Sequence, residues 1–230
     1  MKEFLTTSTY FGVFFCLGAY VLGIAIQKKV RHPLVNGMLI ADILVIGVLL
    51  LLDIDYEKFQ ESAQPLSYLL TPATVCLAIP LYQQLEQLKK HWKAIAAGIL
   101  SGTAGAMVSI WLLSLLLGLN HAEYVSLLPK SVTTAIGMGI SEELNGYVAI
   151  TISAIILTGL LGNIAGAGIL KLLRVHEPVA RGVAMGTASH AFGTARALEL
   201  GPVEGAMSSL SIVTTGLITL VAAQIMAPLI

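Results

Sequence analysis

The chain has 230 residues, of which 56% are hydrophobic and 11% are charged, and its mean hydropathy is +0.85. An average soluble domain carries about 25% charged residues, so this composition excludes a water-soluble globular fold and predicts a protein whose surface faces lipid. Thirteen basic and thirteen acidic residues give a net charge of zero. The sequence has no basic stripe of the kind that binds nucleic acids, so a nucleic-acid partner is not expected.

The N-terminal region predicts a retained first membrane span. Lys2 precedes the apolar run Tyr10–Ile26, which resembles a secretory signal. However, the basic residues Lys28, Lys29 and Arg31 follow the run, and no A-x-A-like cleavage site is evident. We therefore expect the first span to stay in the membrane with its basic end in the cytoplasm.

Six apolar segments have roughly the length, about 20 residues, that a helix needs to cross the hydrocarbon core. They are Tyr10–Ile26, Leu34–Leu52, Leu66–Leu85 (interrupted by Pro72 and Pro80), Ala94–Leu119, Tyr147–Leu173 and Ala206–Ile230. The pattern predicts an all-α polytopic membrane protein with six or more transmembrane helices in one integral membrane domain, residues 1–230. Two further segments, Pro129–Gly146 and Val183–Gly205, are too polar and too rich in glycine for ordinary spans.

Basic residues predict which loops are cytoplasmic. Three clusters carry them: Lys28 to Arg31, Lys89 to Lys93, and Lys171 to Arg181. The acidic loop Asp53–Pro65 and the loop Asn120–Lys130 are expected outside. With Tyr147–Leu173 as one crossing, the two polar segments are then re-entrant and approach each other from opposite faces. The alternative is eight spans, in which both segments cross as broken helices.

An internal similarity supports two repeats. Ala135-Ile136-Gly137 and Ala191-Phe192-Gly193 match at a spacing of 56 residues, and Glu143 then pairs with Glu199. Tandem units that each cross an odd number of times must be inverted, which is typical of transporters. We expect an inverted repeat pair at 129–182 and 183–230, a degenerate copy at 66–128, and N-terminal spans at 1–65. The alternative is chance alignment of small apolar residues.

The first polar segment contains glycines that let the backbone leave helical geometry, Gly137 and Gly139. Broken ends expose N–H and C=O groups that lipid cannot satisfy, so a hydrated cavity or a ligand is expected there. Glu142 and Glu143 could instead cap a helix at the external surface. The residues predicted to bind a substrate in this segment are Thr134, Gly137, Ser141, Glu143 and Asn145.

The second polar segment concentrates ionisable groups, which are costly at membrane depth. The guanidinium of Arg196 matches a carboxylate with two parallel hydrogen bonds, and the freed N–H groups of Gly137 and Gly193 would complete a polar shell. Alternatively, Arg196 and Glu199 form a structural ion pair, and His190 is a satisfied interior histidine. The substrate-binding residues predicted here are Ser189, His190, Gly193, Thr194, Arg196 and Glu199.

No enzyme, metal or cofactor chemistry is predicted. Ser189 and His190 are adjacent, so their side chains diverge, and no H-E-x-x-H motif occurs. Cys16 and Cys76 lie in apolar runs, and we expect two free thiols rather than a disulfide.

The two polar segments also carry a resemblance to a known family. The stretches from Pro129-Lys130-Ser131 to Leu144-Asn145-Gly146 and from Gly186-Thr187-Ala188 to Thr194-Ala195-Arg196 resemble the LrgB/CidB family, and the likeness covers nearly the whole chain. Members were first described as antiholin-like regulators, some are linked to pyruvate movement, and the similar half of a plastid translocator moves glycolate and glycerate.

The resemblance implies a multi-pass protein of the cell membrane that moves small monocarboxylates through a midplane site between the two polar segments. The alternative is an antiholin-like regulator of murein hydrolase export and lysis that transports nothing itself. Expected partners are a small carboxylate, membrane lipid, a smaller LrgA/CidA-type membrane protein and further copies of the chain.

Overall fold

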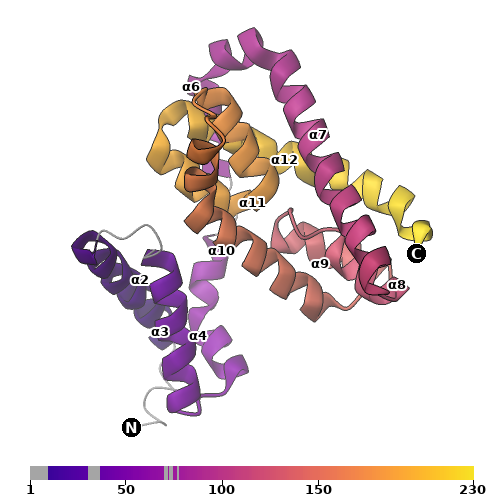
Figure 1. Cartoon of the computed structure of the whole chain (residues 1–230). Helices are drawn as coiled ribbons and strands as arrows, with labels where there is room; N and C mark the ends of the chain where they lie inside the picture. The colour runs from indigo at the N-terminus through magenta and orange to yellow at the C-terminus, as the bar shows by residue number, and fades with distance from the viewer. Residues whose placement is uncertain (1–9, 31–36, 70–71, 73–74, 77) are drawn as a thin grey trace. The chain divides into compact units, whose positions relative to one another are not determined.

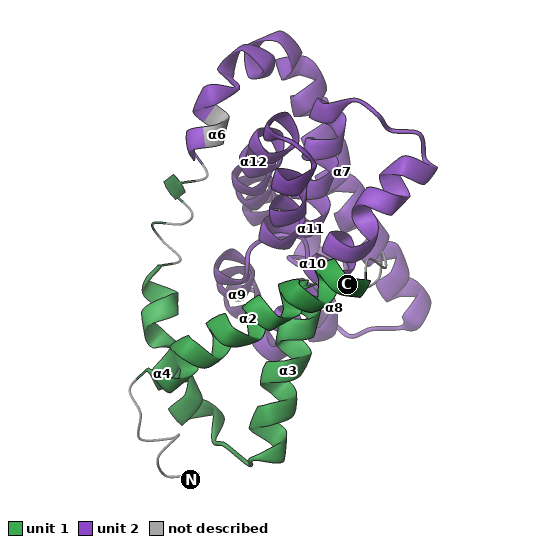
Figure 2. Cartoon of the chain, turned by 90° about the vertical axis from the view of Figure 1, so that its left-hand side faces the viewer, with its two compact units in different colours: residues 1–76 green, residues 77–230 purple. Residues whose placement is uncertain are grey.

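The structure is a computed structural model that describes residues 10–30, 37–69, 72, 75–76 and 78–230. Lys2, Arg31, the start of the predicted span Leu34–Leu52 and parts of the span Leu66–Leu85 lie outside the described residues. Regular secondary structure in the described residues is helical throughout. The chain divides into two compact units, residues 1–76 and 77–230 (Figure 2).

Unit 1 (residues 1–76) contains α2 (Phe11–Val30), α3 (Gly37–Leu51) and α4 (Tyr56–Tyr68). The backbone N–H of Gly12 in α2 donates to the Ser62 hydroxyl of α4 over 3.0 Å. The ring of Phe59 in α4 packs edge-on against Phe11 and Phe15 of α2. Aromatic packing and one buried hydrogen bond thus join the first and third helices of this unit.

The acidic segment Asp53–Pro65, which we expected as an external loop, instead forms most of α4. The side chain of Asp55 accepts hydrogen bonds from the backbone N–H groups of Glu57 and Lys58, which caps the helix N-terminus. Phe59 and Ser62 are buried on one face. The segment is therefore an amphipathic helix, although its acidic residues alone indicated a loop.

Unit 2 (residues 77–230) contains the remaining helices. One of them lies in the segment Asn120–Lys130, which we predicted as a loop, and a capping box between Asn120 and Glu123 stabilises its N-terminus. In chain order they are α6 (Ala78–Gln83), α7 (Leu85–Leu117), α8 (His121–Leu127), α9 (Thr134–Glu143), α10 (Val148–Leu172), α11 (Pro178–Leu200), α12 (Pro202–Met226) and the short 3₁₀ helix η1 (Ala227–Leu229) (Figure 1).

Four helices of the described residues are long and apolar enough to cross a membrane: α2, α7, α10 and α12 with η1. They match four of the six predicted spans, while the apolar helix α3 has 15 residues and is shorter. Large apolar side chains on these helices are exposed, among them Leu116, Leu161 and Leu217. Lipid solvates such side chains, so the multi-pass membrane prediction is confirmed.

Glycines bring the helices of unit 2 into close contact. A Cβ atom at Gly162 of α10 would overlap the side chain of Ser189 in α11. A Cβ at Gly186 of α11 would lie 2.8 Å from the Cα of Ser208 in α12. Small residues let helix backbones approach closely, which is the usual packing mode between membrane helices. Helix α11 is thus held between α10 and α12.

A short helix followed by a long one occurs twice in unit 2. Helix α9 has 10 residues and precedes α10, which has 25. Helix α11 is interrupted at Ser189 and His190, which leaves residues 191–200 as a second short helix ahead of α12, also of 25 residues. The two pairs correspond in position to the predicted repeat.

Candidate functional site

The interruption of α11 is the most unusual backbone feature of unit 2. Ser189 has φ −133° and ψ 18°, and His190 has φ 41° and ψ −133°. A positive φ is uncommon for a residue with a side chain, and it stores backbone strain. The sequence led us to expect the break at a glycine such as Gly193, but Gly193 lies in the helical part after the break.

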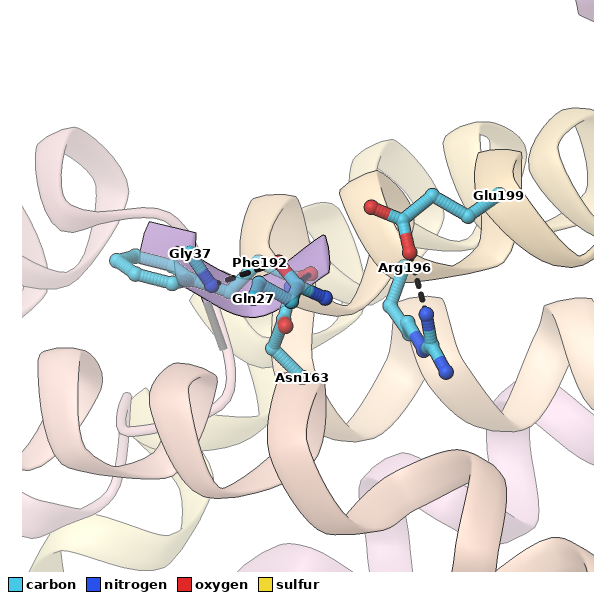
Figure 3. Close-up of polar contacts among 6 residues, drawn as sticks. All are labelled: Gln27, Gly37, Asn163, Phe192, Arg196 and Glu199. Carbon is cyan, nitrogen blue, oxygen red and sulfur yellow. Dashed lines mark hydrogen bonds and ion pairs between the residues drawn. The ribbon is translucent and has the colours of Figure 1, made fainter. Parts of the chain in front are cut away.

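Contacts from α10 support this strained break. The His190 imidazole Nε2 lies 3.0 Å from the carbonyl oxygen of Ile155, and the His190 ring packs edge-on against Phe192 at 5.6 Å between centroids. The Asn163 side-chain amide donates to the Phe192 carbonyl over 2.7 Å (Figure 3). Two residues of α10 therefore bind polar groups of the break itself, at His190, and directly after it, at Phe192.

The Thr194 hydroxyl is satisfied within the protein. It donates to the carbonyl of His190 over 3.0 Å and lies 2.7 Å from the hydroxyl of Ser208 in α12. Ser189, His190, Gly193 and Thr194 are all buried. The structure therefore brings together four of the six residues that we predicted in the second segment.

The other two, Arg196 and Glu199, lie on the surface of the unit. They form an ion pair with each other (Figure 3), and their side chains are 34% and 60% exposed. A second ion pair, which the sequence did not suggest, joins α11 to α12: Arg181 lies 3.3 Å from Glu204, whose side chain is 7% exposed. Basic and acidic positions 23 residues apart give no signal of such a pair.

The first polar segment forms a regular helix rather than a broken one. Helix α9 runs through Gly137 and Gly139, and the N–H of Gly137 donates to the carbonyl of Thr133 over 2.8 Å. The expected freed N–H group at Gly137 is therefore absent. A Cβ at Gly137 would collide with the end of the Ile155 side chain, so this glycine allows α9 to pack on α10.

Ser141 belongs to a buried hydroxyl network between α8, α9 and α10. The Thr151 hydroxyl lies 2.8 Å from the Ser126 carbonyl oxygen and 2.8 Å from the Ser141 hydroxyl. The N–H of Tyr147 donates to the Ser126 hydroxyl over 2.6 Å. These bonds connect the end of α9 to the start of α10 and leave the Ser141 hydroxyl bonded to protein atoms.

The remaining residues predicted in the first segment lie at the two ends of α9. Thr134 is the first residue of the helix and is half-buried, and Glu143 is the last and is exposed. Asn145 is exposed in the following turn with a φ of 59°. The first and second sets of predicted residues both pack on α10: Ile155 contacts Gly137 through its side chain and His190 through its carbonyl.

A groove of about 510 Å³ lies between α7 and α11, and its volume is in the range of small-molecule sites. Most of its lining is small or apolar. The lining residues are His91, Ala94, Ile95, Gly98, Ser101, Gly102, Ala106, Lys130, Ser131, Glu177, Val179, Ala180, Val183, Ala184, Thr187 and Ala188.

Charged and polar groups lie at the two ends of the groove. At one end are His91, where α7 is kinked, and Glu177, which precedes α11. At the other end are Lys130, Ser131 and Thr187, two residues before the break in α11. We call this second end the inner end. The ammonium of Lys130 donates to the Ser131 hydroxyl over 3.1 Å.

Sequence reasoning missed the groove and its inner end. Lys130 was assigned to a loop, and Thr187 was one of several small polar residues before the break. The available signal was Lys130, a lone basic residue at the start of a polar segment that lies between membrane spans. The described residues hold no group of three or more His, Cys, Asp or Glu side chains placed to bind a metal ion.

The fold and the site define a multi-pass membrane protein with a broken, polar helix buried beside a groove. The model of the LrgB-like family matches residues 16–229, so the chain belongs to that family and the predicted resemblance is confirmed. No solved structure matches the chain.

The chain matches curated relatives over nearly their whole length. It is 36% identical over 226 residues to a Bacillus mycoides (strain KBAB4) protein named "Antiholin-like protein LrgB", and the match covers 98% of each chain. Proteins with that name from Bacillus cereus (strain B4264) and Bacillus anthracis (strain CDC 684 / NRRL 3495) match with the same identity and coverage. These names carry no enzymatic activity.

Proposed function

We propose that this chain has an antiholin-like role in the cell membrane, where it regulates murein hydrolase export and lysis. The observation that carries this proposal is the name of the relatives, which match over 98% of both chains. In this role the chain assembles with a smaller LrgA/CidA-type membrane protein and with further copies of itself.

The test uses a bacterial host that lacks its own LrgB-type protein and that produces this chain with and without the smaller partner. We expect less murein hydrolase activity in the culture medium, measured by zymography, and less uptake of a membrane-impermeant dye. Unchanged hydrolase activity and dye uptake in both strains would contradict the regulator proposal.

A second function, movement of small monocarboxylates across the membrane, is favoured by the geometry of α11. Many transporters bind their substrates at interrupted helices. Helix α11 is such a broken helix, and it lies next to a groove that Lys130 lines. In this proposal the two short-plus-long helix pairs are inverted repeats, and six or more helices cross the membrane. The equal lengths of α10 and α12 support the repeat.

Uptake of radiolabelled pyruvate or glycolate into liposomes containing the purified protein tests the carrier proposal. We expect saturable flux that exceeds the flux into empty liposomes. Absence of flux, both alone and with the smaller partner, would remove this second function and leave the regulator.

A further inference from the structure

The inner end of the α7–α11 groove contains a cation without a carboxylate partner among the described residues. The Lys130 side chain is half-buried, and its bond to the Ser131 hydroxyl uses one of its three N–H donors. Among the described residues of this unit, ion pairs join Arg181 to Glu204 and Arg196 to Glu199. A cation away from water is stabilised by an opposite charge, so this site favours an anion.

Thr187 supplies a second, independent observation at the same place. Its side chain is 4% exposed, and its hydroxyl has no hydrogen-bond partner in the described structure. An unpaired buried hydroxyl is unfavourable, and an oxygen atom of a ligand would satisfy it. Seven residues further along α11, the Thr194 hydroxyl is bonded to protein atoms on both sides, and among the described buried hydroxyls without a partner, Thr187 is the one that lines the groove.

The rest of the lining limits which anion fits. Ala106, Ala184 and Ala188 are apolar, so they favour a hydrocarbon body beside the charged group of the anion. The one lysine of the inner end balances a single negative charge, whereas Glu177 at the other end of the groove repels a second one. The lining therefore favours a small organic monoanion over a dianion.

The groove also gives such an anion a path. His91 and Ala106 are 15 positions apart on α7, which corresponds to about 22 Å of helix, or most of a hydrocarbon core of about 30 Å. The His91 end lies beside Lys89, Lys90 and Lys93, the cluster predicted to be cytoplasmic. The groove thus leads from that face to the break in α11.

We propose that Lys130, Ser131 and Thr187 form a binding site for a small organic monoanion at the inner end of the α7–α11 groove. In this site the ammonium of Lys130 pairs with the carboxylate group of the bound anion, and the Thr187 hydroxyl donates to one carboxylate oxygen. The site rests on the carrier function proposed above and assigns the substrate's charge to Lys130 rather than to Arg196.

The experiment measures equilibrium binding of radiolabelled pyruvate to the full-length protein in phosphatidylcholine nanodiscs, with malonate as a dianionic competitor. Lys130→Gln keeps a donor for Ser131 and a similar volume while it removes the charge. We expect it to weaken pyruvate binding by about 10- to 100-fold, the range for a charged hydrogen bond, and Thr187→Val by about 3- to 10-fold. Malonate should compete poorly with pyruvate.

Arg196→Gln is the matched control, because it removes a cation that already has a partner outside the groove. It should change pyruvate binding less than about twofold. Size-exclusion profiles verify that each variant folds, and Lys130→Arg, which keeps the charge, should retain more binding than Lys130→Gln.

The outcomes separate this site from the carrier function. Unchanged pyruvate binding in Lys130→Gln, with flux retained in liposomes, would overturn the site and leave the carrier. Absence of both binding and flux in the unmodified protein would overturn both. Binding of phosphatidylglycerol that depends on Lys130, without pyruvate binding, would assign the cation to a lipid headgroup and overturn the site as proposed.

Discussion

The two polar segments of this protein begin from similar sequence and end as different structures. Helix α9 follows an extended residue, Thr133, and its far end is closed by the hydroxyl network of Ser126, Ser141 and Thr151. The matching part of α11 continues a longer helix through a strained break at Ser189 and His190. Both precede a helix of 25 residues that is apolar enough to cross a membrane.

The difference in hydrogen bonding between the two segments indicates where a ligand can bind. In the α9 segment, the hydroxyls of Ser141 and Thr151 bind each other, so neither of these buried groups is left for a ligand. Beside the α11 break, the hydroxyl of Thr187 is unpaired and the ammonium of Lys130 is half-buried. The α9 side therefore has a structural role, and the α11 side has the features of a binding site.

The largest expected effect comes from a methyl group at the α10–α11 contact. In Gly162→Ala the new Cβ would overlap the Ser189 side chain, so α10 and α11 must separate or the break must shift. We expect destabilisation of about 1–3 kcal/mol or more, measured as a lower melting temperature of the purified protein. Gly168→Ala on the same helix is the control, because its Cβ would meet nothing within 4 Å. Equal melting of the two variants would contradict the close contact.

The hydroxyl network on the α9 side should respond next. Thr151→Val keeps the shape of the side chain but leaves the Ser126 carbonyl and the Ser141 hydroxyl without this partner. We expect a loss of about 1–3 kcal/mol in the free energy of unfolding, with pyruvate binding to the folded fraction unchanged. Ser153→Ala, an exposed hydroxyl on α10, is the control. A selective loss of binding in Thr151→Val would place the ligand on the α9 side instead.

Backbone strain at the break gives a smaller, differential effect. His190→Ala and His190→Gly both remove the imidazole and its contact with the Ile155 carbonyl. Only glycine also relieves the positive φ of 41°. We expect the Gly variant to be more stable than the Ala variant by about 1 kcal/mol, measured by chemical denaturation. If the Ala variant is equally stable, the backbone at residue 190 is not strained.

The smallest effect is expected at the exposed ion pair on α11. Arg196→Gln removes the partner of Glu199, but both side chains are partly exposed. Pairs of this kind contribute about 0–1 kcal/mol, so we expect a melting temperature close to that of the unmodified protein. A large loss of stability would indicate that the pair is covered by lipid or by another subunit rather than exposed to water.

The long apolar helices could be predicted from the sequence because lipid imposes a simple rule on them. Segments such as Ala94–Leu119 and Tyr147–Leu173 need only length and apolar character, and helices α7 and α10 occupy these positions. The helix α4 was missed because its residues are polar and acidic on one side. A cap such as Asp55 followed by buried Phe59 was the signal that could have revealed it.

The candidate site was only partly predictable. Glycine content correctly drew attention to the segment around Gly193, but the break falls at His190, because contacts from Ile155 and Asn163 support it there. The groove arises where Gly102 of α7 approaches Thr187 of α11, positions that are 85 residues apart. Such tertiary contacts leave no pattern in a single sequence.

Access to the inner end of the groove from one membrane face tests the account most directly. In a variant in which Cys16 and Cys76 are replaced by serine, Ala188→Cys introduces one thiol at the break. A charged, membrane-impermeant thiosulfonate should modify this thiol from the membrane face at which Lys89 and Lys90 of α7 lie, and pyruvate should slow the reaction. Modification from the opposite face alone, or a rate that pyruvate leaves unchanged, would contradict a ligand groove that leads to the broken helix.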